Sequence, residues 1–387
     1  MYLDDAGSAP LLPEVREALR DLPEGNPSSP HAEGRGARAA LDTARDMAAQ
    51  ALGADRTEIS FTASGTEAVN LALFGAARRL LGAARRSKRG AIVTWAAEHQ
   101  SVLGAVRHLQ SEGHTVQVAN VDRTGQASPD DIPDSAALVS IGLANNEVGT
   151  IQPVAAIIAR AHEVGALVHV DACAGPRWIP IPDGADLISF SGPKLGGGRG
   201  GILFVRDGVR IDPLLYGGPQ EWGRRGGRED VWAATAVGTA LSVCVRDRAT
   251  RSAIAEQQAA SLRELLVDIG GALTGAESRL PNFATCAFAD RRGEDMLLAL
   301  DLAGIAASSG SACASGSLDP SHVLLSMGLS LERALGSLRL TTGYATTDTE
   351  ISRAMATIRS VFSLSPSGER VGRGERVGRG ERKADIA

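Results

Sequence analysis

Short apolar runs alternate with longer segments of helical periodicity along the first two thirds of the chain. Glycine, proline or polar residues bound the runs, as is typical of buried strands in a parallel sheet. Helical stretches lie between several of them, for example Val154–Glu163. This βαβ repetition predicts an α/β fold with a mostly parallel sheet flanked by helices. The predicted strands are Glu58–Thr62, Ala91–Thr94, Ala137–Leu143, Ala166–Val170, Asp186–Phe190 and Gly201–Val205.

The pattern changes after about residue 255, where the predicted elements form a smaller α+β unit. We expect helices at Ala255–Ile269, Glu294–Ala303 and Thr349–Phe362, and strands at Ala284–Ala289 and Ser337–Thr342. The predicted organisation is an N-terminal segment (1–14) packed with the small domain, a large domain (15–254), a small domain (255–364) and a tail (365–387). The tail repeats Gly-Glu-Arg-Val-Gly-Arg, has almost no apolar residues and is predicted to be disordered.

Composition limits the classes of function. The 387 residues are 43% hydrophobic and 22% charged, which is typical of a globular protein with a full core. The net charge of -5 gives no reason to expect nucleic acid or an anionic membrane as a partner. No apolar run approaches the roughly 18 residues of a membrane span, and the first residues lack the features of a signal peptide. We therefore expect a cytoplasmic protein, and its four cysteines indicate neither a disulfide framework nor a metal site.

Several predicted strands end in residues that suit one kind of cofactor site. Ser64-Gly65-Thr66-Glu67 joins a strand to a helix, and such a helix N-terminus favours a phosphate. Asp171 ends a strand, where a carboxylate can keep the pyridine nitrogen of pyridoxal phosphate (PLP) protonated. Lys194 and Ser191 follow the next strand in a glycine-rich turn, and Schiff-base chemistry needs a lysine held in place. The imidazole of His99 can stack on a planar ring and transfer protons.

Each of these residues also has a purely structural interpretation. The glycine turn at 64–67 is compatible with an ordinary helix cap, and Asp171 with an aspartate that caps a turn. A lysine at a strand end is commonly a solvated cation, and a lone histidine is commonly a structural residue. Taken one at a time, these signals leave both interpretations open.

Two further residues indicate chemistry outside that cluster. Cys313 lies in Ala307-Ser308-Ser309-Gly310-Ser311-Ala312-Cys313-Ala314-Ser315-Gly316-Ser317, a stretch of small polar residues and glycine. Structural cysteines lie in apolar surroundings, so this thiol is predicted to be exposed and reactive. Arg339 lies inside the apolar strand Ser337–Thr342, where its planar guanidinium suits a carboxylate partner such as an amino acid. An incidental loop cysteine and a structural ion pair are the alternatives.

Taken together, these segments resemble the cysteine desulfurases of the NifS/IscS group, within the class V aminotransferases of PLP fold type I. The resemblance runs from Tyr2 to about Phe362. The matching segments keep the same order and spacing, which makes chance agreement negligible. They include Tyr2-Leu3-Asp4, Gly25 to His31, Phe61 to Glu67, Glu98-His99, Asn145 to Pro153, Asp171-Ala172, Ser189 to Lys194, Ser308 to Cys313, Ser321 to Leu324 and Thr346-Thr347.

The resemblance implies a reaction and the residues that perform it. Sulfur leaves L-cysteine, alanine is released, and a persulfide remains on Cys313 for transfer to an acceptor or scaffold protein. Lys194 forms the Schiff base with the cofactor and is the base for the substrate α-proton. His99 stacks on the ring and handles protons. Asn146 lies near the cofactor oxygen and the substrate, and Arg339 binds the substrate carboxylate.

The resemblance also implies how the cofactor is held. Gly65, Thr66 and Ser191 bind its phosphate, and Asp171 pairs with the pyridine nitrogen. A homodimer is expected, because family members complete each active site with residues of a second copy. The family sequence Arg-Ser-Gly-Thr-x-Asn, whose threonine reaches the other copy's phosphate, is Arg225-Gly226-Gly227-Arg228-Glu229-Asp230 in this chain. Arg228 is our candidate for a charged replacement of that contact.

Three positions depart from the family pattern. Pro193 stands where the histidine precedes the lysine, Ala174 where a glutamine bonds the cofactor's phenolic oxygen, and Tyr344 where an arginine follows the strand. Each lost hydrogen bond to a charged group costs roughly 1.5–3 kcal/mol. Cofactor binding is therefore predicted to be weaker than in the family, or rebuilt with other groups.

Three hypotheses remain open from the sequence. The first is an active cysteine desulfurase that feeds an acceptor protein. The second is another PLP reaction on the same fold, such as a cysteine lyase or an amino-acid epimerase, neither of which needs a thiol like Cys313. The third is a catalytically impaired sulfur-relay subunit, suggested by the missing histidine and glutamine.

Overall fold

The computed structural model describes residues 1–82, 90–310 and 320–364. Cys313 and the charged tail 365–387, both prominent in the sequence, lie outside the described residues. Within the described part, no helix is long and apolar enough to cross a bilayer. Nor do His, Cys, Asp and Glu side chains there gather into a group that would hold a metal ion.

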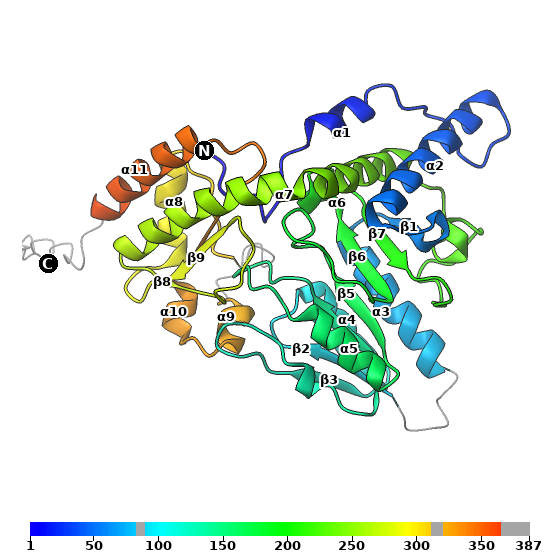
Figure 1. The fold of residues 1–387 in the computed structure, drawn as a ribbon, viewed down its shortest axis with the longest axis horizontal. Helices are drawn as coiled ribbons and strands as arrows, with labels where there is room; N and C mark the ends of the chain where they lie inside the picture. Colours follow the sequence, from blue (N-terminus) through cyan, green and yellow to red (C-terminus); the bar gives the residue numbers. More distant parts are fainter. Residues whose placement is uncertain (83–89, 311–319, 365–387) are drawn as a thin grey trace, which may run out of the picture.

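A seven-stranded sheet forms the centre of the larger unit (Figure 1). Its strand order is β1-β7-β6-β5-β4-β2-β3. Nearly every residue of β1, β2 and β4 to β7 is buried, which explains their almost continuous apolar sequence. The strands are β1 (Ile59–Thr62), β2 (Ala91–Trp95), β3 (Val116–Ala119), β4 (Ala136–Gly142), β5 (Leu167–Asp171), β6 (Leu187–Ser191) and β7 (Gly201–Val205).

Among the described strands, β7 is the one antiparallel strand in this mostly parallel sheet. β7 pairs antiparallel with both β6 and β1, whereas β6, β5, β4, β2 and β3 pair in parallel. The connection from β6 to β7 spans only residues 192–200. A parallel crossover needs about a dozen residues or more, so this connection can only reverse the chain. β1 consequently runs in the same direction as β6, and its carboxyl end meets the same edge of the sheet.

Helices cover both faces of this sheet. α2 (Ala32–Leu52), α5 (Val154–Glu163) and the first half of α7 (Val231–Asp268) pack on one face. α3 (Gly65–Gly82) and α4 (Gln100–Ser111) pack on the other. The sheet is thus buried between two apolar layers, as an α/β fold requires. The mostly parallel α/β fold predicted from the sequence is confirmed.

A three-stranded antiparallel sheet forms the smaller unit, in the order β10-β9-β8. The strands are β8 (Ala272–Leu273), β9 (Phe283–Ala287) and β10 (Ser337–Thr341), and the second half of α7, α8 (Gly293–Leu302) and α11 (Asp348–Leu364) share their apolar core. The remaining helices are α1 (Pro13–Ala18), α6 (Gly192–Leu195), α9 (His322–Ser326), α10 (Leu331–Leu335) and the 3-10 turns η1 (Arg56–Glu58), η2 (Pro129–Asp131) and η3 (Glu221–Gly223).

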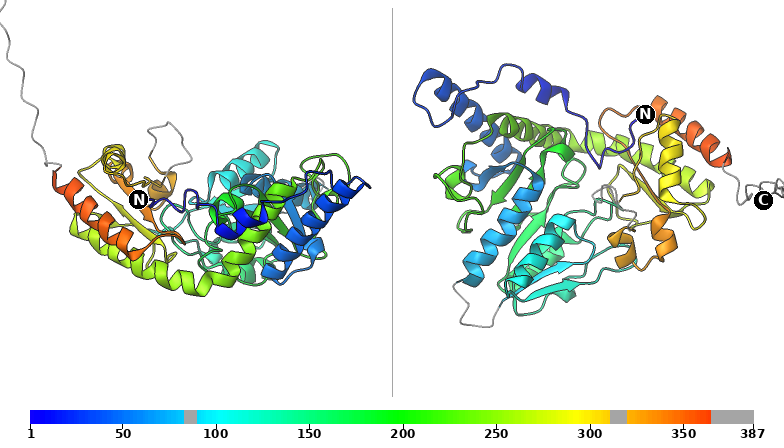
Figure 2. Two further views of the ribbon diagram at one scale, coloured as in Figure 1. Left: turned by 90° about the horizontal axis from the view of Figure 1, so that it is seen from above. Right: turned by 180° about the vertical axis from the view of Figure 1, so that it is seen from behind.

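Two segments join the units. α7 runs unbroken from the large sheet to the small one and passes position 255, the boundary chosen from the sequence (Figures 1 and 2). The N-terminal segment lies along the small unit, where Leu3 N–H donates to Ala306 O at 2.9 Å and Thr341 N–H donates to Leu3 O at 2.7 Å. The buried Leu3 side chain enters the small unit's core. The exact domain limits stay a prediction.

Candidate active site

A cavity of about 300 Å³ opens at the carboxyl ends of the parallel strands. Its walls come from the chain directly after β1, β2, β4, β5 and β6, because the carboxyl ends of these strands meet at one edge of the sheet. The cavity brings together seven residues that the sequence indicated from five separate segments. They are Gly65, Thr66, His99, Asn146, Asp171, Ser191 and Lys194.

One end of the cavity is shaped by a close approach of three segments. A Cβ added to Gly65 would lie 2.7 Å from Cys173 Sγ and 2.8 Å from Ser191 Cβ, so only glycine fits there. Gly65 begins α3, and Ser64 Oγ accepts the N–H of Glu67 at 3.1 Å in the first turn. The start of this long helix and the nearby hydroxyl of Ser191 form an environment suited to a phosphate.

Asp171 also lines the cavity and is held by a buried hydrogen-bond chain. Its Oδ1 accepts the N–H of Cys173 at 2.9 Å and the hydroxyl of Ser189 at 3.2 Å. The Nε2 of His169 lies 3.2 Å from Ser189 Oγ, and its Nδ1 lies 2.9 Å from Ser140 Oγ. Because Ser189 donates to the carboxylate, its oxygen accepts from His169 Nε2, and His169 Nδ1 accepts from Ser140. This chain fixes the orientation of Asp171.

His169 remains uncharged within this series of hydrogen bonds. Its side chain is fully buried, and desolvation lowers its pKa to about 4, although the nearby Asp171 opposes the shift. A neutral imidazole therefore supports Asp171 at neutral pH. Neither Ser140 nor Ser189 was predicted from the sequence to support Asp171. Successive side chains of a strand point to opposite faces, so His169 and Asp171 share one face of β5. This spacing is the sequence feature that could have indicated a contact between the two residues.

Lys194 lies in α6, directly after β6. Its Nζ donates to the carbonyl oxygen of Ala6 at 2.7 Å, so the N-terminal segment reaches the cavity. The turn around Lys194 is tight, since a Cβ on Gly192 would lie 2.1 Å from Arg199 O. The lysine is thereby held at a fixed point on the cavity wall.

Glu98 is a second buried carboxyl in the cavity, and no role for it was predicted from the sequence. Its side chain lines the cavity, and Oε1 accepts the N–H of Gly142 at 3.0 Å. Burial raises its pKa to about 8, with a smaller contribution from the charge of Asp171. Glu98 is therefore protonated over most of the neutral range, and it does not add a second negative charge beside Asp171.

We predict that Glu98→Gln removes a pH dependence of stability from the cofactor-free protein. Below pH 4.5, the ordinary pKa of glutamate, the carboxyl is protonated in both states. As pH rises from 4.5 toward 8, Glu98 ionises in the unfolded chain but stays largely protonated in the folded protein. The free energy of unfolding therefore falls by up to about 5 kcal/mol. Urea denaturation at pH 5 and pH 8 measures the difference. Exposed Glu112→Gln is the control, and equal pH dependence of Glu98→Gln and the wild type would refute the prediction.

Arg339 lies in β10 beside the cavity, at 3% exposure. Its guanidinium donates to Asn146 O at 2.6 Å and pairs with Asp4 Oδ1 at 2.8 Å. Its Nε is buried and has no hydrogen-bond partner within the described ranges. A carboxylate is the natural partner for such a donor. Arg228, in contrast, is exposed, donates to Glu24 O and Gly25 O, and is not part of the cavity wall.

The three departures from the family pattern have different structural consequences. Ala174 lines the cavity and offers no hydrogen-bonding side chain. Pro193 lies in the first turn of α6, and its carbonyl accepts the N–H of Ala9 at 2.9 Å, which links the lysine turn to the N-terminal segment. Tyr344 lies in a different cavity, next to Arg177.

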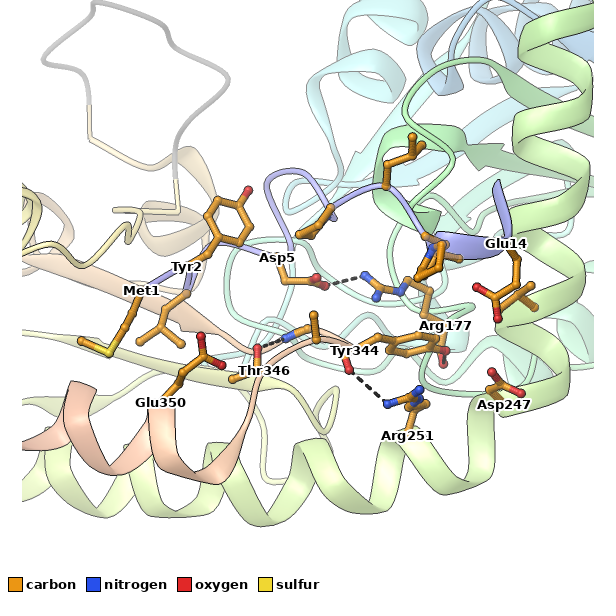
Figure 3. Close-up of a pocket in the computed structure, with 18 residues that line it drawn as sticks. Met1, Tyr2, Asp5, Glu14, Arg177, Asp247, Arg251, Tyr344, Thr346 and Glu350 are labelled. Atoms are coloured by element: carbon orange, nitrogen blue, oxygen red, sulfur yellow. Dashed lines mark hydrogen bonds and ion pairs between the residues drawn. The ribbon is translucent and has the colours of Figure 1, made fainter. Parts of the chain in front are cut away.

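That second cavity, of about 330 Å³, lies where the N-terminal segment, α7 and residues 343–350 meet (Figure 3). Arg177 points at Asp5 in its floor, with a distance of 2.6 Å between Nη1 and Oδ2. The Arg177 guanidinium lies 4.2 Å from the ring centroid of Tyr344, and the Tyr344 hydroxyl donates to Arg177 O at 3.0 Å. Tyr344 therefore supports a buried ion pair next to Ala6, the residue that binds Lys194.

Comparisons with known proteins agree with this geometry. The family model described as aminotransferase class-V matches residues 1–354. The cysteine desulfurase IscS of Dictyoglomus turgidum is 37% identical over 375 residues, covering 93% of this chain and 94% of that protein. This chain belongs to the class-V aminotransferases, in the cysteine desulfurase group.

Solved structures support the same assignment. A NifS-like protein has a TM-score of 0.85 at 29% identity, covering 94% of this chain and 100% of that one. SspA, solved in complex with cysteine, has a TM-score of 0.75 at 30% identity, covering 88% of this chain and 98% of that one. The predicted family, the fold and the cysteine desulfurase function are thereby confirmed.

Class-V aminotransferases are PLP enzymes, and the cavity residues fit that cofactor. The helix start at Gly65 and the hydroxyls of Thr66 and Ser191 suit its phosphate, and Asp171 suits its pyridine nitrogen. A side chain at Gly65 would clash with Cys173 and Ser191, so this part of the cavity wall requires glycine. A cofactor with both a phosphate and a basic ring nitrogen therefore matches the groups that line the cavity.

Proposed function

We propose that this enzyme removes sulfur from L-cysteine with PLP and leaves a persulfide on Cys313. The observation that carries the proposal is the convergence of Lys194, Asp171 and the Gly65 turn on one cavity, with Arg339 beside it. This set supplies a group for each part of the cofactor and a cation for the substrate carboxylate. Cys313 enters from the sequence and the family, because it lies outside the described residues.

PLP, when bound, withdraws electrons from the substrate α-carbon. Asp171 keeps the pyridine nitrogen protonated, and the chain of Ser189 and His169 keeps that carboxylate in place. The Lys194 amine takes the α-proton of the substrate. His99, at the start of α4, stacks on the ring and transfers protons near the substrate sulfur.

Arg339 and Cys313 act on the substrate itself. Arg339 orients the substrate carboxylate through its unsatisfied Nε, and Asn146, whose carbonyl holds the guanidinium, lies near the substrate. The Cys313 thiolate attacks the substrate sulfur, so that an S–S bond forms as the C–S bond breaks. The carbon that loses sulfur takes a proton, and alanine leaves. L-Cysteine and the Cys313 thiol thus give alanine and the Cys313 persulfide, with all atoms conserved.

The persulfide is passed to a sulfur-acceptor or scaffold protein, and the working enzyme is a homodimer. Arg228 does not line the cavity of its own chain, and its guanidinium is exposed, so in a dimer it would exchange its bonds to Glu24 O and Gly25 O for the phosphate site of the second copy. Such a contact would offset part of the binding lost at Ala174 and Pro193. The cytoplasmic location stays a prediction from the sequence.

The test is alanine formation from L-cysteine with added PLP and a thiol reductant. We expect alanine from the wild type and at least about a hundredfold less from Cys313→Ala, because the nucleophile is gone. Cys286→Ala, which removes a thiol buried in the small unit, is the control and retains activity. Equal alanine formation by Cys313→Ala and the wild type would refute the persulfide mechanism.

A further inference from the structure

Glu147 is a buried carboxylate that the proposed mechanism does not use. It follows β4 in the segment Asn145–Glu147, and its exposure is 7%. Its backbone N–H donates to Asn145 Oδ1 at 2.8 Å, which fixes the local turn. A buried carboxylate is costly unless it is hydrogen-bonded, so its partners indicate its task.

The partners of Glu147 lie on both sides of the segment that contains Cys313. Oε2 accepts the hydroxyl of Ser321, and Oε1 lies 4.0 Å from His322 Nδ1. On the other side, a Cβ added to Gly310 would lie 3.5 Å from both Glu147 Cβ and Oε2. Residues 311–319 connect these two sides, so the Glu147 side chain binds the chain just after them and lies next to the chain just before them.

The same part of the large unit borders the cofactor cavity. Asn145 and Asn146 line the cavity, and Asn146 O accepts from Arg339 at 2.6 Å. His322 Nε2 donates to the carbonyl oxygen of Glu98, another cavity residue, at 3.0 Å. The residues that contact Gly310 and Ser321 therefore lie directly beside residues that line the cofactor cavity.

From these contacts we propose that Glu147 is a positioning residue for sulfur transfer. It binds Ser321 and lies next to Gly310, the two ends of the Cys313 segment, and so keeps them beside the cavity in which the substrate is activated. The cofactor-dependent steps at Lys194 do not need this anchor, but the attack by Cys313 does. The inference rests on the proposed function and adds a residue that acts on the thiol step alone.

The experiment measures the two steps separately in the PLP-loaded enzyme. Exchange of the L-alanine α-proton in D2O, followed by NMR, reports on the cofactor and Lys194 and requires no thiol. Single-turnover persulfide formation from L-cysteine, followed by mass spectrometry, reports on Cys313. For Glu147→Ala we expect the exchange rate to stay within about twofold of the wild type and persulfide formation to be about a hundredfold slower. A rate loss of this size is typical when a reacting group is misplaced by about 1 Å.

Matched variants separate anchoring from a general loss of structure. Ser321→Ala removes the hydroxyl partner from the other side and should slow the same step, and its effect should not add to that of Glu147→Ala. Glu147→Gln keeps an acceptor for Ser321 and should retain most of the persulfide rate. Glu163→Ala, an exposed carboxylate on α5, is the control for charge alone.

The outcomes distinguish the proposals. Loss of exchange and persulfide formation together, or loss of neither, would overturn the positioning role of Glu147 while leaving the proposed function intact. A wild type that exchanges the alanine proton but forms no persulfide would overturn both the positioning role of Glu147 and the proposed function. The wild-type measurement alone reveals that outcome, before any variant is compared.

Discussion

Replacing Lys194 by alanine is expected to lower alanine formation from L-cysteine by about ten-thousandfold. The substitution removes the amine that holds the cofactor covalently and, in the proposed mechanism, the base that takes the α-proton. Loss of a positioned proton-transfer group alone costs roughly 10²–10⁴-fold. The chain has three lysines, Lys88, Lys194 and Lys383, of which only Lys194 is within the described residues, and it lines the cavity.

This scarcity of lysine allows a direct chemical test. Reduction of the PLP-loaded protein with borohydride, followed by peptide mass mapping, should place the cofactor adduct on Lys194. Lys194→Ala should lose that adduct, and the control Lys88→Ala should retain both the adduct and the activity. An adduct of unchanged yield on Lys88 or Lys383 in the Lys194→Ala protein would contradict the assignment of the cavity.

The strand ends were the most predictable part of the site. A parallel sheet gathers the carboxyl ends of its strands, so a carboxylate after β5 and a lysine after β6 must lie near each other. The apolar runs also gave β7 and α5 with their observed limits. The direction of β7 depended on the length of its connection to β6, which an apolar pattern does not encode.

The supporting contacts were not predictable from local sequence. The bond from Ser321 to Glu147 joins positions 174 residues apart, and the pair of Arg339 with Asp4 joins positions 335 residues apart. Only the packing of the small unit and the N-terminal segment against the large unit creates them. Propensity and periodicity report on neighbours a few residues apart and therefore do not detect such pairs.

Breaking the pair of Asp5 and Arg177 is expected to cause the largest loss of stability of any substitution proposed for this protein. Both side chains are buried, at 2% and 3% exposure, and they lie next to the segment that contacts Lys194 (Figure 3). Burial raises the pKa of Asp5, because desolvation outweighs the attraction of Arg177. The pair is consequently a weak source of net stability, yet breaking it is costly, since one buried charge then lacks its partner.

The two ways of breaking this pair should differ. Asp5→Ala leaves a guanidinium that cannot lose its proton, and we expect the free energy of unfolding to fall by about 3–5 kcal/mol. Arg177→Met leaves a carboxyl that can take a proton, so its cost should be smaller and should decrease as pH is lowered. The double variant should be more stable than Asp5→Ala.

Urea denaturation at two pH values measures the stability of all three variants. The control is Glu17→Ala, which breaks an exposed ion pair and is expected to cost less than about 1 kcal/mol. Equal, pH-independent losses for Asp5→Ala and Arg177→Met would show that lost packing, rather than an unpaired charge, sets the cost at this site.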